Sequence, residues 1–279
     1  MTQRLCDGFQ NARAGAPVKP TSVLTRLFRL ARAALHLARG VTIAALVFPF
    51  VDGASRARHV QRWSARLVEV FAVRVEVRGS PHVAATRPLM LVANHVSWLD
   101  IFAINAVRPV RFVAKAEIRR WPVIGWLCER GGTLFIERAR KRHTSQINAQ
   151  IVAALERGEV FAVFPEGSTT KGDVVLPFHA SLLQPALVCG AVLQPVAVRY
   201  LRADGSLCAE ADYEGDKSLV ETVRLMITQP VIVAQLEFLA PLDSADRHRR
   251  EIAHEAAQRI ANALGVPAPR SRAKISSGR

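Results

Sequence analysis

Seven short apolar runs, rich in β-branched residues, alternate with helix-like stretches between residues 73 and 239, and this alternation constrains the fold more than any other feature. The runs are VRVEV (73–77), LMLVA (89–93), RFVA (111–114), TLFI (133–136), VFAVF (160–164), LQPVAVRY (193–200) and VIVAQLEFL (231–239). Near-continuous apolar strands separated by helices are typical of a mostly parallel sheet covered on both faces. The sequence therefore predicts an α/β fold with a mostly parallel central sheet flanked by helices, such as TSQINAQIVAALER ending at Gly158.

A basic amphipathic helix is predicted to precede this sheet, starting at Val23. One face carries Arg26, Arg29, Arg32, His36 and Arg39, and the opposite face carries Leu24, Leu27, Ala31, Leu35 and Ala38. Gly40 then opens an uncharged stretch, VTIAALVFPFV, that is shorter than the roughly 20 residues needed to cross a bilayer. We expect it to dip into one leaflet, since a longer span would carry Arg32, His36 and Arg39 into the membrane.

A second basic helix follows in SRARHVQRWSARLVEVFA, with Val60, Trp63, Leu67 and Val70 on one face and Arg58, Arg62 and Arg66 near the other. Two such helices around an apolar patch favour a membrane anchor attracted to anionic lipid, which gives an N-terminal amphipathic two-helix membrane-anchoring segment. The alternative is a helical hairpin that packs on the domain and solvates its arginines. A secretory signal fits poorly, because more arginines follow the apolar stretch in place of a small-residue cleavage site.

The net charge of +15 indicates an anionic partner, which by charge alone is either a membrane surface or nucleic acid. A non-catalytic nucleic-acid-binding protein is the distant alternative, but no aromatic RNA-binding or helix-turn-helix signature accompanies the arginines. The four cysteines, at 6, 128, 189 and 208, have neither metal-ligand nor disulfide-framework spacing. We predict no metal and a cytoplasm-facing setting.

Polar groups follow the predicted strands at the end where parallel sheets place their sites. NHVSWLD follows residues 89–93, Lys115 follows 111–114, Arg138 comes shortly after 133–136, and PEGSTT follows 160–164. In NHVSWLD, Ser97 and Asp100 have the spacing of a capping box, in which the serine oxygen binds the third amide and the carboxylate reaches back. That spacing leaves His95 unexplained.

Catalysis explains both His95 and Asp100. A histidine in the loop and a carboxylate in the first helical turn can face each other, which fixes the ring tautomer and makes the imidazole a general base. A serine hydrolase is disfavoured because the chain has no G-x-S-x-G elbow. The hydroxyl that is deprotonated is therefore expected to belong to a substrate.

These residues resemble the glycerolipid acyltransferases typified by 1-acyl-glycerol-3-phosphate acyltransferase. The resemblance covers roughly residues 70 to 240 in four ordered motifs. They are Asn94, His95 and Asp100; GTLFIER with Gly132, Phe135, Ile136 and Arg138; Phe164, Pro165, Glu166, Gly167 and Ser168; and AVLQPVAV around Pro195. The segment KAEIRRWPVIGW, with Lys115, Glu117, Pro122 and Gly125, is also similar.

The resemblance implies transfer of a fatty acyl group from acyl-CoA or acyl carrier protein to a lysolipid hydroxyl, with no other cofactor. His95, oriented by Asp100, would act as general base, Glu166 would orient the site, and amides around Gly167 would stabilise the oxyanion. Lys115 and Arg138, with Ser168, Thr169 and Thr170, would bind the acceptor headgroup. The implied partners are the lysolipid, the acyl donor and an anionic membrane surface, without nucleic acid.

The acceptor itself stays open. The commonest acceptor in the family is 1-acyl-glycerol-3-phosphate, which gives phosphatidic acid in phospholipid biosynthesis. Many phosphatidic-acid-forming relatives carry Arg where this chain has Thr169, and TTKGDVVLPF resembles relatives that acylate lyso-ornithine lipid, the alternative acceptor. We expect a flexible tail (1–22), membrane-associating helices (23–72), a catalytic domain (73–265) and a basic flexible tail (266–279), located on the cytoplasmic face of the inner cell membrane.

Overall fold

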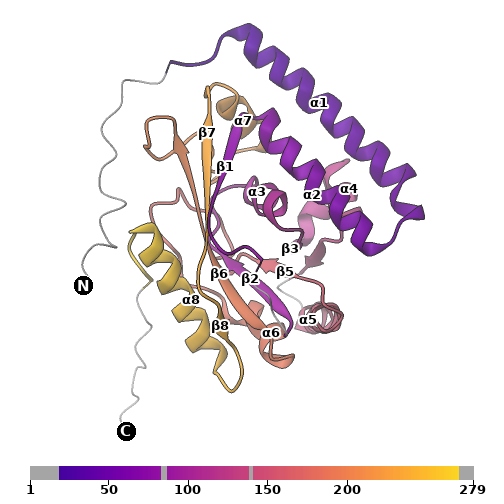
Figure 1. Cartoon of the computed structure of the whole chain (residues 1–279), viewed down its shortest axis with the longest axis vertical. Coiled ribbons are helices and arrows are strands. Elements are labelled where there is room, and N and C mark those ends of the chain that lie inside the picture. Colours follow the sequence, from indigo (N-terminus) through magenta and orange to yellow (C-terminus); the bar gives the residue numbers. More distant parts are fainter. Residues whose placement is uncertain (1–18, 83–86, 138–140, 270–279) are drawn as a thin grey trace.

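An eight-stranded sheet forms the centre of the described part of the chain, which comprises residues 19–82, 87–137 and 141–269 of the computed structural model (Figure 1). The strands are β1 (Val73–Gly79), β2 (Leu89–Ala93), β3 (Arg111–Lys115), β4 (Leu134–Ile136), β5 (Phe161–Val163), β6 (Val192–Arg202), β7 (Ile232–Phe238) and β8 (Leu242–Asp243). Their order is β1-β7-β6-β2-β5-β3-β4, and β8 pairs with β6. The seven predicted strands are confirmed to within two residues at each end, and β8 was not predicted.

The sheet is mostly parallel, as expected. β6, β2, β5, β3 and β4 run in one direction, whereas β7 and β8 are antiparallel to β6 and β1 is parallel to β7. An antiparallel partner needs no crossover, so the connection of residues 203–231 begins and ends at one edge of the sheet. The carboxyl ends of β2, β5, β3, β4 and β6 lie at that same edge.

Helices cover both faces of the sheet (Figure 1). They are α2 (Gly53–Val70), α3 (Asp100–Val107), α4 (Ile124–Arg130), α5 (Lys141–Glu156), α6 (Gln184–Val188), α7 (Leu219–Met226) and α8 (Arg249–Leu264), with 3-10 turns at Phe48–Phe50, Ala116–Arg120 and Ala180–Leu183. All five residues of β2 are buried, and they alternate between two cores. Leu91 packs with Leu99 and Ile104 on the α3 side, and Val92 packs with Ile151 on the α5 side. The predicted end of α5 at Gly158 is confirmed by its positive φ of 81°.

The N-terminal helix α1 (Val23–Leu46) begins at Val23 as predicted and continues through Gly40 into the uncharged stretch. A Cβ at position 40 would lie 2.6 Å from the indole nitrogen of Trp63 in α2, so the glycine allows close packing of the two helices. His36 and Trp63 stack at 4.7 Å, and each is hydrogen-bonded to the carbonyl of the other. Tertiary packing thus compensates for the low helix propensity of glycine.

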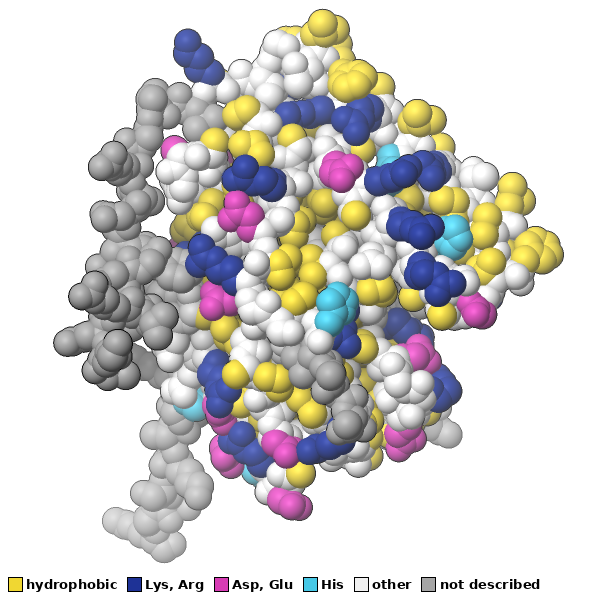
Figure 2. Space-filling model, in the orientation of Figure 1, with side chains coloured by type: hydrophobic (Ala, Val, Ile, Leu, Met, Phe, Trp, Pro, Cys, Tyr) yellow, Lys and Arg dark blue, Asp and Glu magenta, His cyan; other side chains and the backbone are white. Residues whose placement is uncertain are grey.

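The predicted apolar face of α1 is exposed, and its basic face is divided, with Arg29 and His36 buried and Arg32 and Arg39 exposed. Arg29 and His36 are only 9% and 7% exposed, and Arg29 donates to the carbonyls of Ile227, Gln229 and Pro230. Leu24 and Leu35 are 78% and 73% exposed. Figure 2 shows hydrophobic side chains along the outer rim formed by α1, with Lys and Arg beside them. The alternative of a hairpin that solvates its arginines therefore does not hold for Arg29, whose guanidinium, like the His36 ring, is hydrogen-bonded within the protein.

Within the described residues, Val23–Phe50 forms one continuous helical stretch of 28 residues that is long and apolar enough to cross a membrane by length and composition. The second helix agrees with its pattern: Leu67 and Val70 are buried and Arg58, Arg62 and Arg66 are exposed. Residues 1–18 and 270–279, which make up most of the two predicted tails, lie outside the described residues.

Candidate active site

His95 and Asp100 face each other at the carboxyl end of β2. His95 lies in the loop after the strand and Asp100 is the first residue of α3, and 2.7 Å separate Nδ1 of the imidazole from Oδ2 of the carboxylate. The Asp100 side chain is fully buried, and the His95 side chain is 21% exposed. A carboxylate on Nδ1 leaves Nε2 as the ring nitrogen available to a ligand.

The Asp100 carboxylate is held by three further donors. The backbone N–H groups of Val96 and Ser97 donate to Oδ2 at 2.8 and 3.0 Å, and the Tyr200 hydroxyl donates to Oδ1 at 2.7 Å. The capping-box interpretation is therefore half right. The carboxylate reaches back as expected, but the buried Ser97 hydroxyl has no hydrogen-bond partner in the described chain, because the turn places Leu99 at the cap position.

Two aromatic rings support the imidazole. The Phe164 ring stacks on His95 with centroids 4.1 Å apart and planes 11° apart, and Phe112 stacks on Phe164 at 5.7 Å. Phe164 directly follows β5 and Phe112 is in β3, so three neighbouring strands determine the position of the histidine ring.

Glu166 ties the loop after β5 to the histidine loop. Its Oε2 accepts the backbone N–H of His95 at 2.5 Å and its Oε1 accepts the N–H of Leu176 at 2.8 Å. Burial raises the pKa of Glu166 to about 7, with a smaller contribution from the charge of Asp100, although both backbone hydrogen bonds oppose the rise. Glu166 therefore fixes the position of the His95 backbone relative to the loop after β5.

The segment after Glu166 lies against the same loop. Gly167 has a φ of 81°, and its N–H donates to the Phe164 carbonyl at 3.3 Å, so that amide is used by the turn. The Thr170 N–H donates to the His95 carbonyl at 2.9 Å, and the Thr169 hydroxyl donates to the carbonyl of Tyr213. In the described chain no acceptor is found for the amides of Ser168 and Thr169, which follow the turn.

The predicted cationic residues are not brought together in the same way. Lys115 is exposed at the end of β3, at the same edge of the sheet, but β5 separates that strand from β2, and no contact between Lys115 and the His95 loop is found among the described residues. Arg138 lies outside the described residues. Lys171 is nearer the loop and is paired with Glu214 at 3.6 Å.

An apolar cavity lies between β3 and the helices α1, α2, α3 and α4. Phe112, Ala114, Phe102, Trp63 and Ile43 are among its lining residues. The lining follows the chain from Ala114 and Phe112 of β3 back to Val110, just before the strand, four steps of roughly 3.3 Å or about 13 Å. Phe112 connects this cavity to the His95 ring through Phe164.

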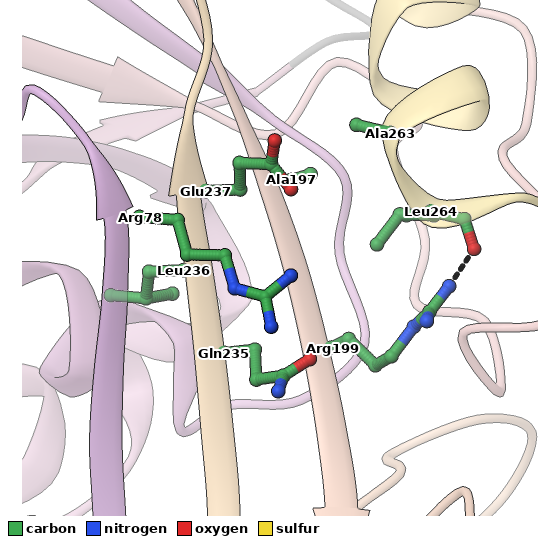
Figure 3. A pocket seen from close by; sticks show the side chains of 8 residues that line it. All are labelled: Arg78, Ala197, Arg199, Gln235, Leu236, Glu237, Ala263 and Leu264. Atoms are coloured by element: carbon green, nitrogen blue, oxygen red, sulfur yellow. Dashed lines mark hydrogen bonds between the residues drawn. The ribbon is translucent and has the colours of Figure 1, made fainter. Parts of the chain in front are cut away.

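The opposite face of the sheet carries a smaller hollow beside α8, lined by Arg78, Arg199, Glu237 and Leu264 (Figure 3). The Arg199 side chain crosses to the Leu264 carbonyl at the end of α8. Neither this hollow nor any other part of the described chain contains a group of three or more His, Cys, Asp or Glu side chains that could hold a metal ion.

Comparison with known proteins places the chain in a family. The family described as Acyltransferase matches residues 74–199. A lyso-ornithine lipid O-acyltransferase from Pseudomonas aeruginosa is 38% identical over 88% of this chain and 96% of its own. A 1-acyl-sn-glycerol-3-phosphate acyltransferase from Neisseria meningitidis is 35% identical over 82% of this chain and 89% of its own.

The fold is also that of a solved structure, the 1-acyl-sn-glycerophosphate (LPA) acyltransferase PlsC from Thermotoga maritima. That chain is 22% identical, has a TM-score of 0.62, and matches over 88% of this chain and 96% of its own. The chain belongs to this acyltransferase family of lipid metabolism, which confirms the resemblance seen in the four motifs.

Tyr200 was missed at the sequence level although it contacts Asp100. The available signal was its position in LQPVAVRY: Val196, Val198 and Tyr200 are two residues apart, so their side chains lie on the same buried face of the strand. A polar side chain on the buried face of a strand requires a partner.

Proposed function

We propose that this protein is a membrane-associated lysolipid O-acyltransferase that uses an acyl thioester as donor and His95 as general base. The observation that carries the proposal is the 2.7 Å contact between His95 Nδ1 and the buried Asp100 carboxylate, which presents Nε2 as the proton acceptor. In the proposed step, Nε2 takes the proton of the acceptor hydroxyl while its oxygen attacks the thioester carbonyl carbon. The carbon–sulfur bond then breaks, and the imidazolium protonates the leaving thiolate, giving an ester and a free thiol.

Amides and the apolar cavity provide the rest of the proposed site. Because the Gly167 amide is used by its turn, the amides of Ser168 and Thr169 are better candidates to bind the oxyanion. The acyl chain would lie in the cavity along β3, where apolar lining removes it from water. The donor is acyl-CoA or acyl carrier protein.

Two acceptors are proposed, and the residues after Glu166 favour one over the other. With 1-acyl-glycerol-3-phosphate the product is phosphatidic acid, and Lys115, Arg138 and Lys171 are the candidate cations for its phosphate. Thr169 carries no charge, and Lys171 is partly neutralised by Glu214. A paired cation and anion suit a zwitterionic headgroup better than a phosphomonoester, which favours lyso-ornithine lipid.

The membrane association rests on α1. The helix combines exposed Leu24, Leu27 and Phe28 with its own exposed Arg32 and Arg39, and the Arg32 guanidinium lies over the Phe28 ring. Apolar and basic side chains together are the combination that binds an anionic bilayer surface. The cytoplasmic face of the inner membrane, where acyl-CoA and acyl carrier protein are found, is the proposed location.

The decisive experiment is a thiol-release assay on the purified full chain in vesicles that contain anionic lipid. Each acceptor is combined with acyl-CoA or acyl carrier protein, and the acylated product is identified by mass spectrometry. We expect release of thiol and product with at least one acceptor. Release with neither acceptor, from protein shown to be folded, would refute the proposed function.

His95→Ala tests the base. Turnover should fall by at least about a hundredfold, the range expected for loss of a general base. His82→Ala is the matched control, because His82 is exposed and follows β1, which runs opposite to β2 and ends at the other edge of the sheet. Near-normal turnover in His95→Ala would eliminate the general-base role.

A further inference from the structure

Tyr200 occupies a position that the four family-like motifs do not account for. It lies near the end of β6, 2% exposed, and its hydroxyl is 2.7 Å from Oδ1 of Asp100. Side chains alternate along the strand: Arg199 points towards α8, as Figure 3 shows, so Tyr200 points to the opposite face, where α3 begins. A residue one hundred positions away in sequence thereby reaches the carboxylate that orients His95.

The donors to Asp100 are divided between its two oxygens. Oδ2 takes the His95 ring and the N–H groups of Val96 and Ser97, while Tyr200 is the donor found at Oδ1 in the described chain. Burial, followed by the charge of Asp100, raises the pKa of the Tyr200 phenol well above its ordinary value. The phenol therefore stays protonated and donates its proton to the carboxylate throughout the accessible pH range.

We propose that Tyr200 is a positioning residue for acyl transfer: its hydroxyl holds Oδ1 of Asp100 so that Oδ2 stays directed at His95 and the carboxylate charge is partly dispersed. This inference rests on the proposed function of His95. Without the phenol, Oδ1 is a buried carboxylate oxygen with no donor, and the negative charge is compensated only through Oδ2. The carboxylate then attracts a positively charged imidazole more strongly, so regeneration of the free base is less favourable and the acidic limb of the activity profile moves to higher pH.

In the described chain, Glu166, from the loop after β5, interacts with the charge of Asp100, and Cys208, which follows β6, interacts with Tyr200. The Cys208 thiol stays neutral because burial, with the nearby Glu210, raises its pKa to about 12. Glu166, whose pKa is about 7, faces the His95 backbone and is repelled by Asp100, so its titration overlaps the pH range of interest. The pH profile is therefore measured with Glu166→Gln as the common background as well as in the native chain.

Tyr200→Phe keeps the ring and removes the hydroxyl. We expect kcat to fall on the order of tenfold with little change in KM, since one hydrogen bond to a charged group is lost and no substrate contact changes. The acidic limb of the kcat profile should move upward by roughly half a pH unit. The matched control is Ser244→Ala, which removes another buried hydroxyl donor, bound to the Ala186 and Ala191 carbonyls away from His95.

A purely structural role gives a different pattern. Tyr200→Phe and Ser244→Ala would then both lower the melting temperature and leave the acidic limb in place, which would overturn the proposal. A readout independent of turnover is the Nδ1 proton resonance of His95, assigned by its loss in His95→Ala. It should shift in Tyr200→Phe and not in Ser244→Ala. If no acceptor is acylated by the native chain, the resonance still tests the link between Tyr200 and His95, and only the proposed function fails.

Discussion

Glu166→Gln should remove a pH-dependent part of the free energy of unfolding. The carboxyl is buried, and its pKa is raised from 4.5 to about 7 in the folded protein. The folded state therefore binds a proton at Glu166 more tightly than the unfolded chain, so the contribution of this group to stability is fully present below pH 4.5 and is lost as the pH rises towards 7. At about 1.4 kcal/mol per pH unit, this one group accounts for a loss of about 3 kcal/mol over that interval.

Replacing Glu166 by glutamine changes both the hydrogen bonds at this position and the pH dependence of stability. Ionised Glu166 accepts the N–H groups of His95 and Leu176 on its two oxygens, whereas the amide of glutamine has one acceptor and leaves one backbone donor facing an NH2 group. That mismatch costs about 1–3 kcal/mol at every pH. The pH-dependent loss, in contrast, should disappear, because the amide does not titrate.

Urea unfolding followed by tryptophan fluorescence, at pH 4.5 and pH 7.5, separates the two effects. The native chain should lose about 3 kcal/mol more than Glu166→Gln between these conditions. Glu69→Gln, which changes an exposed carboxyl on α2, serves as the control for neutralising a glutamate. Equal pH dependence in the native chain and in Glu166→Gln would show that burial does not make this carboxyl basic, and the reasoning would fail.

Two further predictions concern the proposed lipid contacts. Ala114→Trp should narrow the cavity beside Phe112 and lower kcat/KM for long-chain relative to medium-chain acyl thioesters by roughly tenfold, measured in the thiol-release assay; an unchanged ratio would place the acyl chain elsewhere. Leu24→Glu combined with Leu35→Glu should weaken co-sedimentation with anionic vesicles by at least about tenfold, since each exposed leucine contributes about 1.5–3 kcal/mol when buried. Undiminished binding of folded protein would mean that α1 does not enter the bilayer.

The strands and the His95–Asp100 pair were predictable because their determinants are local. A buried parallel strand shows as a continuous apolar run, and a histidine just before a helix is within reach of a carboxylate in its first turn. The antiparallel direction of β7 was not predictable from its composition, because VIVAQLEFL has the same apolar character as the parallel strands. Strand direction depends on which edge the connection follows, and periodicity does not contain that information.

Long-range partners account for the other differences. The pattern of α1 shows two faces, but only the contact of Arg29 with the carbonyls around Gln229 decides which face meets the protein. Likewise Gly40 is a helix breaker by propensity, yet here it accommodates Trp63. The Ser97 cap was mispredicted because the first turn is organised by the Asp100 carboxylate and not by the serine hydroxyl.

The arrangement of α1 links the two halves of the proposed function. Its outward side exposes leucines, and its inward side, through Gly40, Ile43 and Ala44, forms part of the cavity wall beside β3. Arg29 fixes the start of the helix to the turn before β7, close to the edge of the sheet that carries His95. Under the proposed function, one rigid helix thus contacts the bilayer and encloses the acyl chain. A lipid acceptor would then reach Nε2 of His95 without exposing its apolar chains to water. The unfavourable free energy of hydrating those chains is therefore avoided when the acceptor meets the thioester.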